Sequence, residues 1–391
     1  MDPTTQAVRA MYERYPYPAH SSPQVRVGCD VRLALSHGRL PAPDRPLRAL
    51  DAGCGRGVGL LGMAALQPDV QFLGVDMNRV ALAEVRAEVA RRGMKNVAVQ
   101  EVDLMTLAGL EIPEGGFDLI VSSGVLHHLS DPAEGLRRLR EALAPHGVLT
   151  LMVYGQYGRE GIYRLVRAID ALIPRDRPLE ERLAVGRRLV REAAMPGITD
   201  GPWKELAALA DEEFVDRYLN VNERAYTVDQ LYDLLEENGL CLLDFCDRVD
   251  WSMPPGIGEG SPARVRHRIV ENLQWRPKLS CYATHAANGP RPPVPPAEYA
   301  LHVAAVHPEC NFQISSRNLH RFQRVETLHY QVQRRDPVRV PTGPMAEAVM
   351  ILKDQNAPFR LGNLITHIRS KGGEPLEILR RLLEEEVIYL P

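Results

Sequence analysis

A glycine-rich loop that follows an acidic residue is the most informative chemical feature of the sequence. The loop DAGCGRG, residues 51–57, begins with the last two residues of the apolar run 48–52 and continues beyond it. Glycine has no Cβ and tolerates positive φ, so such a loop lets the backbone approach a small ligand closely. A pyrophosphate group prefers helix N–H groups and positive potential. The carboxylate of Asp51 therefore disfavours a dinucleotide and suits a ligand with cationic groups.

Two further carboxylates end the next two apolar runs. Asp76 closes the run VQFLGVD, and Asp103 closes VAVQEVD. A carboxylate in the place of Asp76 can accept both ribose hydroxyls, as it does in dinucleotide enzymes at a similar spacing. Met77 can lie against an adenine ring, and Asp103 can accept the adenine amine or, alternatively, cap a helix. Together these residues indicate a site for an adenosine-containing ligand.

The motifs DAGCGRG, GVDMN, VDLM and FDLIVSSGVLHHLSDP follow one another in order and spacing. They resemble the class I S-adenosylmethionine-dependent methyltransferases of the ubiquinone-methyltransferase-like branch, strongly over residues 47–154 and more loosely to about 286. S-adenosylmethionine has no phosphate, and its ammonium and sulfonium groups suit the acid before the glycines. The resemblance implies a cofactor pocket lined by Asp51, Gly53, Gly55, Asp76, Met77, Asp103, Leu104 and Ser122. Arg56 departs from the small or polar residue usual in this loop, and we expect its side chain to point outward.

Two adjacent histidines, His127 and His128, follow the apolar run 117–123, where a methyl acceptor would meet the cofactor. Methyl transfer from a sulfonium is an in-line displacement that mainly needs alignment in a dry site. A base is needed only if the acceptor carries a proton, and a histidine can then serve. Either histidine can instead have a structural role. As catalytic candidates we prefer His128 marginally over His127.

Aromatic residues gather near the N-terminus, although they make up only 6% of the chain. Tyr15 and Tyr17 are candidates for a lid whose rings shield a sulfonium and exclude water. Ordinary packing of a proline-rich arm is the alternative. Tyr157 and Arg159 leave the apolar run 147–154 toward the same cleft, and we expect them to bind an acidic or polar group of the substrate.

Alternation of apolar runs with helical segments positions these residues. It predicts an α/β fold with a Rossmann-like, mostly parallel seven-stranded sheet. The expected strands lie at residues 48–52, 70–76, 97–103, 117–123, 147–154, 240–247 and 278–285, the last of them antiparallel. Asp131, followed by Pro132 and Glu134, predicts a helix start. The sequence Thr227-Val-Asp-Gln230 predicts a capping box.

The domain organisation follows from changes in composition along the chain. We expect an N-terminal arm or lid at residues 1–45 and a methyltransferase domain at 46–286, with a helical insertion at about 158–222. A proline-rich linker follows at 287–297. Residues 298–391 resemble a small winged-helix-like α+β domain, with helices expected at 345–352, 361–370 and 376–386 and a terminal strand at 387–390.

Composition narrows the classes of partner. The net charge of −3 and a pI near 6.5 disfavour nucleic acid and anionic membranes as partners. The six cysteines form no CxxC pair, which indicates reduced thiols in a cytoplasmic protein without a metal site. No apolar run reaches the ~18 residues of a membrane helix.

Three functional hypotheses remain open at this point. The first is a methyltransferase for a small-molecule or natural-product-like acceptor. The second is a protein or peptide methyltransferase that uses residues 298–391 for substrate binding or as a homodimer contact. The third is a non-catalytic regulatory protein that retains the fold. Asp51 disfavours a nicotinamide oxidoreductase.

Overall fold

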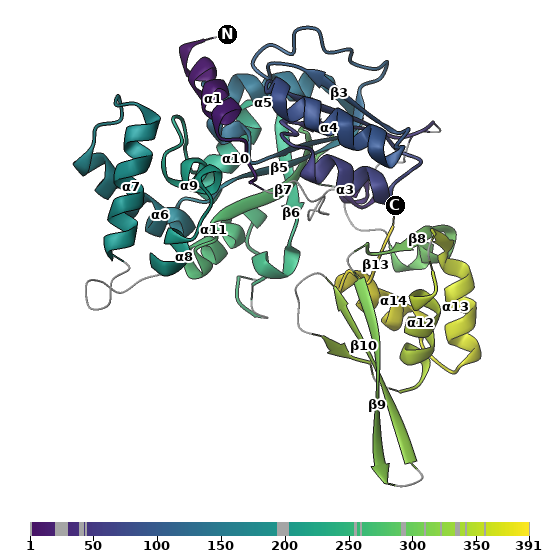
Figure 1. Cartoon of the computed structure of the whole chain (residues 1–391). Helices are drawn as coiled ribbons and strands as arrows, with labels where there is room; N and C mark the ends of the chain where they lie inside the picture. The colour runs from purple at the N-terminus through teal and green to yellow at the C-terminus, as the bar shows by residue number, and fades with distance from the viewer. Residues whose placement is uncertain are drawn as a thin grey trace. The chain divides into compact units, whose positions relative to one another are not determined.

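The computed structural model contains two compact units. It describes residues 2–19, 30–38, 43, 45–193, 203–253, 256–258, 260–290, 295–308, 310–320, 323–332, 337–340, 342–355 and 357–390. The first unit comprises Met1–Val31 and Pro43–Pro290 (Figure 1), and the second comprises Arg32–Ala42 and Arg291–Pro391. None of the helices in these described ranges combines the length and apolar character that a membrane crossing needs.

A seven-stranded sheet with the order β3-β2-β1-β4-β5-β7-β6 forms the centre of the first unit. Its strands are β1 Arg48–Ala52, β2 Gln71–Asp76, β3 Val97–Glu101, β4 Phe117–Ser123, β5 Leu143–Tyr154, β6 Leu240–Phe245 and β7 Lys278–His285. The first five pair in parallel, and β7 is antiparallel to both of its neighbours. The expected Rossmann-like, mostly parallel sheet is confirmed, although β5 begins earlier than expected. Strand order reverses between β1 and β4, where open α/β sheets bind ligands at the carboxyl ends of their strands.

Helices cover both faces of this sheet, with α3 and α4 together on one face (Figure 1). The helices between or beside the strands are α3 Val58–Leu66, α4 Arg79–Arg92, α5 Pro132–Ala142, α10 Val228–Glu237 and α11 Ala263–Gln274. The Asp131 carboxylate accepts the N–H groups of Ala133 and Glu134, which confirms the predicted start of α5. Thr227 and Gln230 form the predicted capping box of α10.

A second apolar core lies within the segment between β5 and α10. Four helices build it: α6 Glu160–Leu172, α7 Leu179–Ala193, α8 Trp203–Ala207 and α9 Asp211–Tyr218. Ile169, Val190 and Phe214 are fully buried there, and α1 (Pro3–Arg14) contributes Met11 to the same cluster. The N-terminal helix and this helical segment therefore fold as one layer through shared apolar contacts.

The C-terminal unit has its own core of buried aliphatic residues and two small sheets, with the orders β11-β10-β9 and β12-β8-β13. Its elements are η4 Pro296–Leu301, β8 Val303–Val306, β9 Cys310–His320, β10 Gln323–Val332, β11 Val338–Arg339, α12 Pro344–Lys353, β12 Phe359–Arg360, α13 Leu361–Ser370, α14 Pro375–Glu384 and β13 Ile388–Tyr389. Helix α2, Val31–Gly38, falls almost entirely in the range grouped with this unit. The three expected helices are present, whereas the β9–β10 hairpin has no predicted counterpart, because its polar sequence lacks a continuous apolar alternation.

Candidate active site

The loop after β1 is held in a conformation that only glycine fits. Gly53 has φ +85°, and a Cβ at this position would overlap the Val125 side chain, with Cγ1 2.8 Å away. The N–H groups of Gly53 and Cys54 both donate to the carbonyl of Val75, at 2.8 and 2.9 Å. The end of β2 therefore fixes the loop that follows β1, and both lie at the carboxyl edge of the sheet.

The Asp76 carboxylate is part of this arrangement. Its Oδ2 accepts the N–H of Gly55 and its Oδ1 accepts the N–H of Asn78, each at 2.8 Å. Burial raises the pKa of Asp76, while these backbone N–H bonds oppose the rise. Each carboxylate oxygen can accept a second bond. The side chain is thus oriented while keeping capacity for a ligand.

The other acidic and apolar candidates surround the same edge. Asp51 is buried at the end of β1. Asp103 Oδ1 accepts the N–H of Met105 at 2.9 Å in a turn, and no helix among the described residues begins there, so the alternative role of Asp103 as a helix cap is wrong. Leu104 and Ser122 are buried, and Ser122 Oγ has no hydrogen-bond partner among the described residues.

Arg56 does not point outward, contrary to expectation. Its Nε donates to Glu84 at 2.7 Å, and its Nη1 donates to the carbonyls of Pro18 and Ala19 at 2.8 and 3.0 Å. The guanidinium satisfies two backbone carbonyls of the N-terminal arm that would otherwise need other donors. Arg56 therefore fastens the arm to the glycine-rich loop.

Tyr12 of α1 contacts both the residues that follow β2 and the region of α9. Its carbonyl accepts Asn78 Nδ2 at 3.0 Å, next to the end of β2. Its hydroxyl donates to Asp216 Oδ1 at 2.7 Å and accepts from Asn220 Nδ2 at 3.1 Å. Burial raises the pKa of Tyr12 well above its usual value, and burial also raises the pKa of Asp216. The phenol consequently keeps its proton and remains a donor.

The bond to Asn222 defines the protonation of His128. His128 Nδ1 lies 2.9 Å from the carbonyl oxygen of Asn222, which can only accept, so Nδ1 carries the proton. Asn222 Nδ2 donates in return to the carbonyls of His128 and Leu129, both at 2.9 Å. Burial lowers the pKa of His128 to about 4. The neutral ring thus has its basic lone pair on Nε2.

His127 is fully buried in the turn η1 (Leu126–His128), and neither ring nitrogen has a hydrogen-bond partner among the described residues. The centroid of its ring lies 3.9 Å from the centroid of the Tyr154 ring and 4.2 Å from that of the His128 ring. Burial lowers the pKa of His127 well below its usual value, and Arg159 adds to this effect. A buried polar group without a partner is uncommon in folded proteins and requires an explanation.

Arg159 and Glu223 form a buried ion pair beside these histidines. Arg159 Nη2 lies 2.7 and 2.9 Å from the two Glu223 oxygens, and the guanidinium carbon lies 3.5 Å from the centroid of the Tyr154 ring. Arg159 Nε is buried and has no partner within the described ranges. The arrangement thus offers one unpartnered N–H donor, Arg159 Nε, next to a neutral histidine. The positive charge of the guanidinium is compensated by Glu223.

Comparison with known proteins identifies the kind of domain that residues 50–149 form. A model of the methyltransferase domain family matches residues 50–149. A trans-aconitate 2-methyltransferase of Methylobacterium radiotolerans is 33% identical over 153 positions. The match covers 39% of this chain and 55% of that enzyme, so it spans about half of the enzyme's length. The chain carries a class I methyltransferase domain. Its cofactor is S-adenosylmethionine.

Two further similarities extend over most of the molecule. An uncharacterized protein of Synechococcus sp. is 28% identical over 413 positions, which cover the whole chain and 94% of that protein. PKMT2 from Rickettsia typhi, in complex with AdoHcy, has a TM-score of 0.68 at 16% identity and covers 96% of this chain and 77% of its own. At that identity the likeness concerns the fold alone.

The remaining predicted residues of the methyltransferase domain lie in more exposed positions. Tyr17 and Tyr157 are 37% and 41% exposed. Tyr15 is half-buried and packs against the core of the helical segment 160–218. Sequence reasoning missed two residues that the structure brings near the histidines, Tyr12 and Asp216, and named Asn222 and Glu223 only as weaker candidates. Their signal was weak, because each becomes recognisable only through a partner far away in the sequence.

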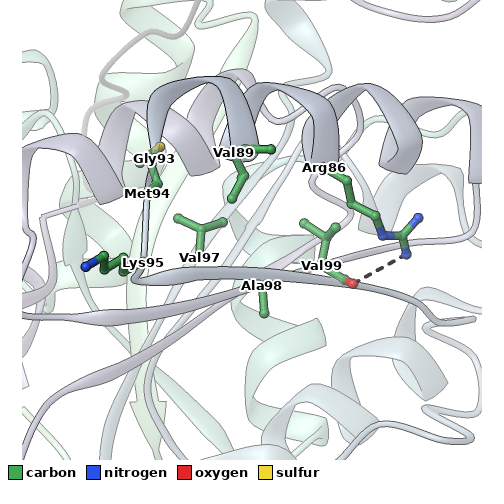
Figure 2. A pocket seen from close by; sticks show the side chains of 9 residues that line it. Arg86, Val89, Gly93, Met94, Lys95, Val97, Ala98 and Val99 are labelled. Atoms are coloured by element: carbon green, nitrogen blue, oxygen red, sulfur yellow. Dashed lines mark hydrogen bonds between the residues drawn. The ribbon is translucent and has the colours of Figure 1, made fainter.

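A shallow hollow of about 400 Å³ lies elsewhere on the methyltransferase domain, between α4 and the edge strand β3. Figure 2 shows Val97 and Val99 pointing toward Val89 of α4, with Arg86 hydrogen-bonded to the Val99 carbonyl at 3.5 Å. None of the candidate site residues lines this hollow. It therefore gives no reason to move the site from the carboxyl ends of the strands.

Proposed function

We propose that the first unit binds S-adenosylmethionine at the carboxyl ends of β1, β2 and β3 and transfers its methyl group to a small-molecule acceptor that presents an oxygen. The cofactor would lie against the candidate residues named from the sequence: Asp51, Gly53, Gly55, Asp76, Met77, Asp103, Leu104 and Ser122. The observation that carries the acceptor proposal is the buried Arg159 Nε, which has no partner among the described residues. A donor in this state stabilises a ligand oxygen, because otherwise its desolvation is not compensated.

His128 is the proposed base when the acceptor carries a proton. The Asn222 carbonyl holds the Nδ1 proton, so Nε2 is directed to take the proton of an attacking hydroxyl as the oxygen–methyl bond forms. The methyl–sulfur bond breaks in the same step, and its electron pair remains on sulfur. A carboxylate acceptor carries no such proton, and the histidine would then only exclude water. His127, neutral and unpartnered, is the proposed contact for the acceptor itself.

The named activity of a relative fits an oxygen acceptor. Trans-aconitate is a carboxylate, and that relative is 33% identical over 39% of the chain. A carboxylate oxygen is also a strong acceptor for a guanidinium N–H. Carboxylic acids are therefore the first acceptor class to examine.

A peptide or other amine is the second candidate acceptor. Asp216 and Glu223 place two buried carboxylates beside several tyrosine rings, and burial raises the pKa of both acids. Carboxylates and aromatic faces both stabilise cations such as an ammonium group. Under this alternative, the C-terminal unit would act as a winged-helix-like module for substrate binding or dimerisation.

The other sequence expectations enter as parts of the same proposal. The arm with Tyr15 and Tyr17 would be a lid over the cofactor, and the insertion at about 158–222 would cover the acceptor. Arg56 supports the lid because it binds the arm at Pro18 and Ala19. The ubiquinone-methyltransferase-like branch remains the proposed affiliation.

Calorimetric titration of the full chain with S-adenosylmethionine tests the cofactor site. We expect Asp76→Asn to weaken binding by about 10- to 100-fold, since hydrogen bonds to a charged group contribute about 1.5–3 kcal/mol. Glu111→Gln, which changes an exposed acid in the loop after β3, is the matched control and should leave affinity unchanged. Equal affinity of Asp76→Asn and the unmodified chain would contradict the proposed site.

Release of AdoHcy with three acceptor types then separates the acceptor hypotheses. Trans-aconitate and a simple phenol represent oxygen acceptors, and a lysine-containing peptide represents amines. Turnover of the oxygen acceptors that Arg159→Lys lowers would support the proposal, because lysine keeps the charge but loses the Nε donor. Turnover of the peptide alone would favour the second candidate.

A further inference from the structure

The segment that follows α11 is joined to the loop that leaves β5. The N–H of Gly155 donates to the carbonyl of Pro277 at 3.0 Å. A Cβ at Gly158 would overlap the backbone of residues 275–277, so only glycine allows this close approach. The same loop continues into Tyr157 and Arg159 (η2), on the β4–β5 side of the site, where the methyl acceptor is proposed to bind. We call this the acceptor side. Residues 275–277 are therefore a direct extension of that side of the site.

Trp275 occupies an energetically unfavourable position at this junction. Its φ of 48° and ψ of 55° are left-handed, at the C-terminal end of α11, where glycine is the usual residue. A bulky residue in this conformation is an outlier that generally reflects a constraint. Its side chain is nevertheless 68% exposed, although tryptophan is usually well buried. Neither backbone preference nor burial explains a tryptophan here.

Exposed apolar side chains continue along the same segment. Leu273, two positions earlier in α11, is 71% exposed, and Tyr157 on the facing loop is 41% exposed. The backbone contact between Gly158 and residues 275–277 keeps the two segments together. Apolar surface is thereby concentrated beside the loop that carries Arg159.

We propose that Trp275, together with Tyr157, forms a docking subsite for an apolar planar part of the methyl acceptor. This inference rests on the proposed function. The occupant is the acceptor because the subsite is continuous, through Gly155 and Gly158, with the loop that supplies Arg159. The acceptor would then be an extended molecule, with its oxygen at the buried Arg159 and its ring outside against Trp275. Ring stacking and burial of exposed apolar surface supply the affinity.

A matched pair of carboxylic acids tests the subsite by calorimetry on the AdoHcy-loaded full chain. 4-(4-Nitrophenyl)butanoate carries a planar ring, and butanoate lacks it. We expect Trp275→Gly to raise the Kd of the ring-bearing acid about 10-fold and Trp275→Phe to raise it about 2-fold, since an aromatic pair contributes modestly beyond its area. Butanoate affinity should not change. Leu66→Ala, which removes another exposed apolar side chain (60%) at the end of α3, is the control and should change neither.

Thermal unfolding of the same variants distinguishes binding from a structural role. Trp275→Gly should leave the midpoint unchanged or raise it by a few degrees, because glycine adopts the left-handed conformation without strain. A lowered midpoint with unchanged Kd would overturn the subsite and assign Trp275 to packing. A shift from dimer to monomer in Trp275→Gly, measured by sedimentation, would instead assign it to a subunit contact. Failure of AdoHcy to bind would overturn the proposed function, whereas AdoHcy binding with equal probe affinities would overturn the subsite alone.

Discussion

The two sides of the carboxyl edge are built in different ways. On the side of β1 to β3, carboxylates at or just beyond the strand ends accept nearby backbone N–H groups, as Asp76 accepts those of Gly55 and Asn78. On the side of β4 and β5, side chains hold one another across long stretches of sequence, as Arg159 and Glu223 do. The first side therefore depends on local backbone geometry, and the second depends on particular pairs of side chains.

This difference has a consequence for substitution. A carboxylate such as Asp76 that is changed to an amide keeps its shape and leaves no buried charge behind, although the NH2 group can no longer accept one of the two backbone N–H bonds. A buried ion pair loses both partners at once, because removal of one charge leaves the other uncompensated. We therefore expect substitutions on the acceptor side to affect folding, and substitutions on the other side to affect ligand affinity.

Arg159→Met should give the largest effect, because it removes the cation of the buried ion pair on the acceptor side. Both members of the pair are buried, so Glu223 would remain as an unpaired charge at neutral pH. We expect the free energy of unfolding to fall by about 3–5 kcal/mol, as for other broken buried pairs. Denaturant-induced unfolding at pH 7 measures this quantity.

The double variant Arg159→Met with Glu223→Leu is the matched control for that loss. It removes the unpaired charge and should restore most of the stability, because an apolar pair of similar volume is tolerated in such positions. A single variant that loses less than about 1 kcal/mol would mean that the pair is solvated, and that the two sides do not differ in this respect.

The same difference explains what the sequence could predict. The sheet, the start of α5, the capping box and the loop after β1 all follow from patterns within a few positions, such as Asp131 before Pro132. Asp216 could not be predicted, because its position opposite Tyr12 depends on the packing of α9 against α1, more than 200 residues away in the chain. Arg56 was misjudged for a similar reason, since its acceptor carbonyls belong to the arm.

Tyr12→Phe sharpens the comparison, because Tyr12 contacts both sides with different groups. The variant keeps the carbonyl that accepts Asn78 Nδ2 but removes the hydroxyl that donates to Asp216. We expect the free energy of unfolding to fall by about 1–3 kcal/mol, the cost of leaving a buried acceptor unsatisfied. S-adenosylmethionine affinity, measured by calorimetry, should change less than 2-fold.

Two outcomes for Tyr12→Phe would contradict the division into two sides. A loss of cofactor affinity as large as that expected for Asp76→Asn would mean that the hydroxyl also orders the cofactor side. Unchanged stability would mean that Asn220 or solvent replaces the hydroxyl at Asp216. Glu13→Gln is a control on the same helix, since it removes the surface ion pair of Glu13 with Arg9 within α1 and leaves the contact of Arg9 with Glu101 in place.

Glu271→Gln gives the smallest effect and one that depends on pH. Glu271 Oε1 accepts the N–H of Val228, the first residue of α10, close behind the segment that carries Glu223. Burial raises the pKa of Glu271 from 4.5 to about 7. The folded chain then binds a proton that the unfolded chain has released, so the stability contributed by Glu271 is complete below about pH 4.5 and is lost as the pH rises through about 7. Gln keeps the carbonyl acceptor and cannot ionise.

The stability of Glu271→Gln relative to the unmodified chain should therefore increase from pH 5 to pH 8 in denaturant unfolding. Glu237→Gln, on the exposed face of α10, is the control and should show no such trend. A difference that stays constant with pH would mean that Glu271 is solvated and that this end of the acceptor side does not respond to pH.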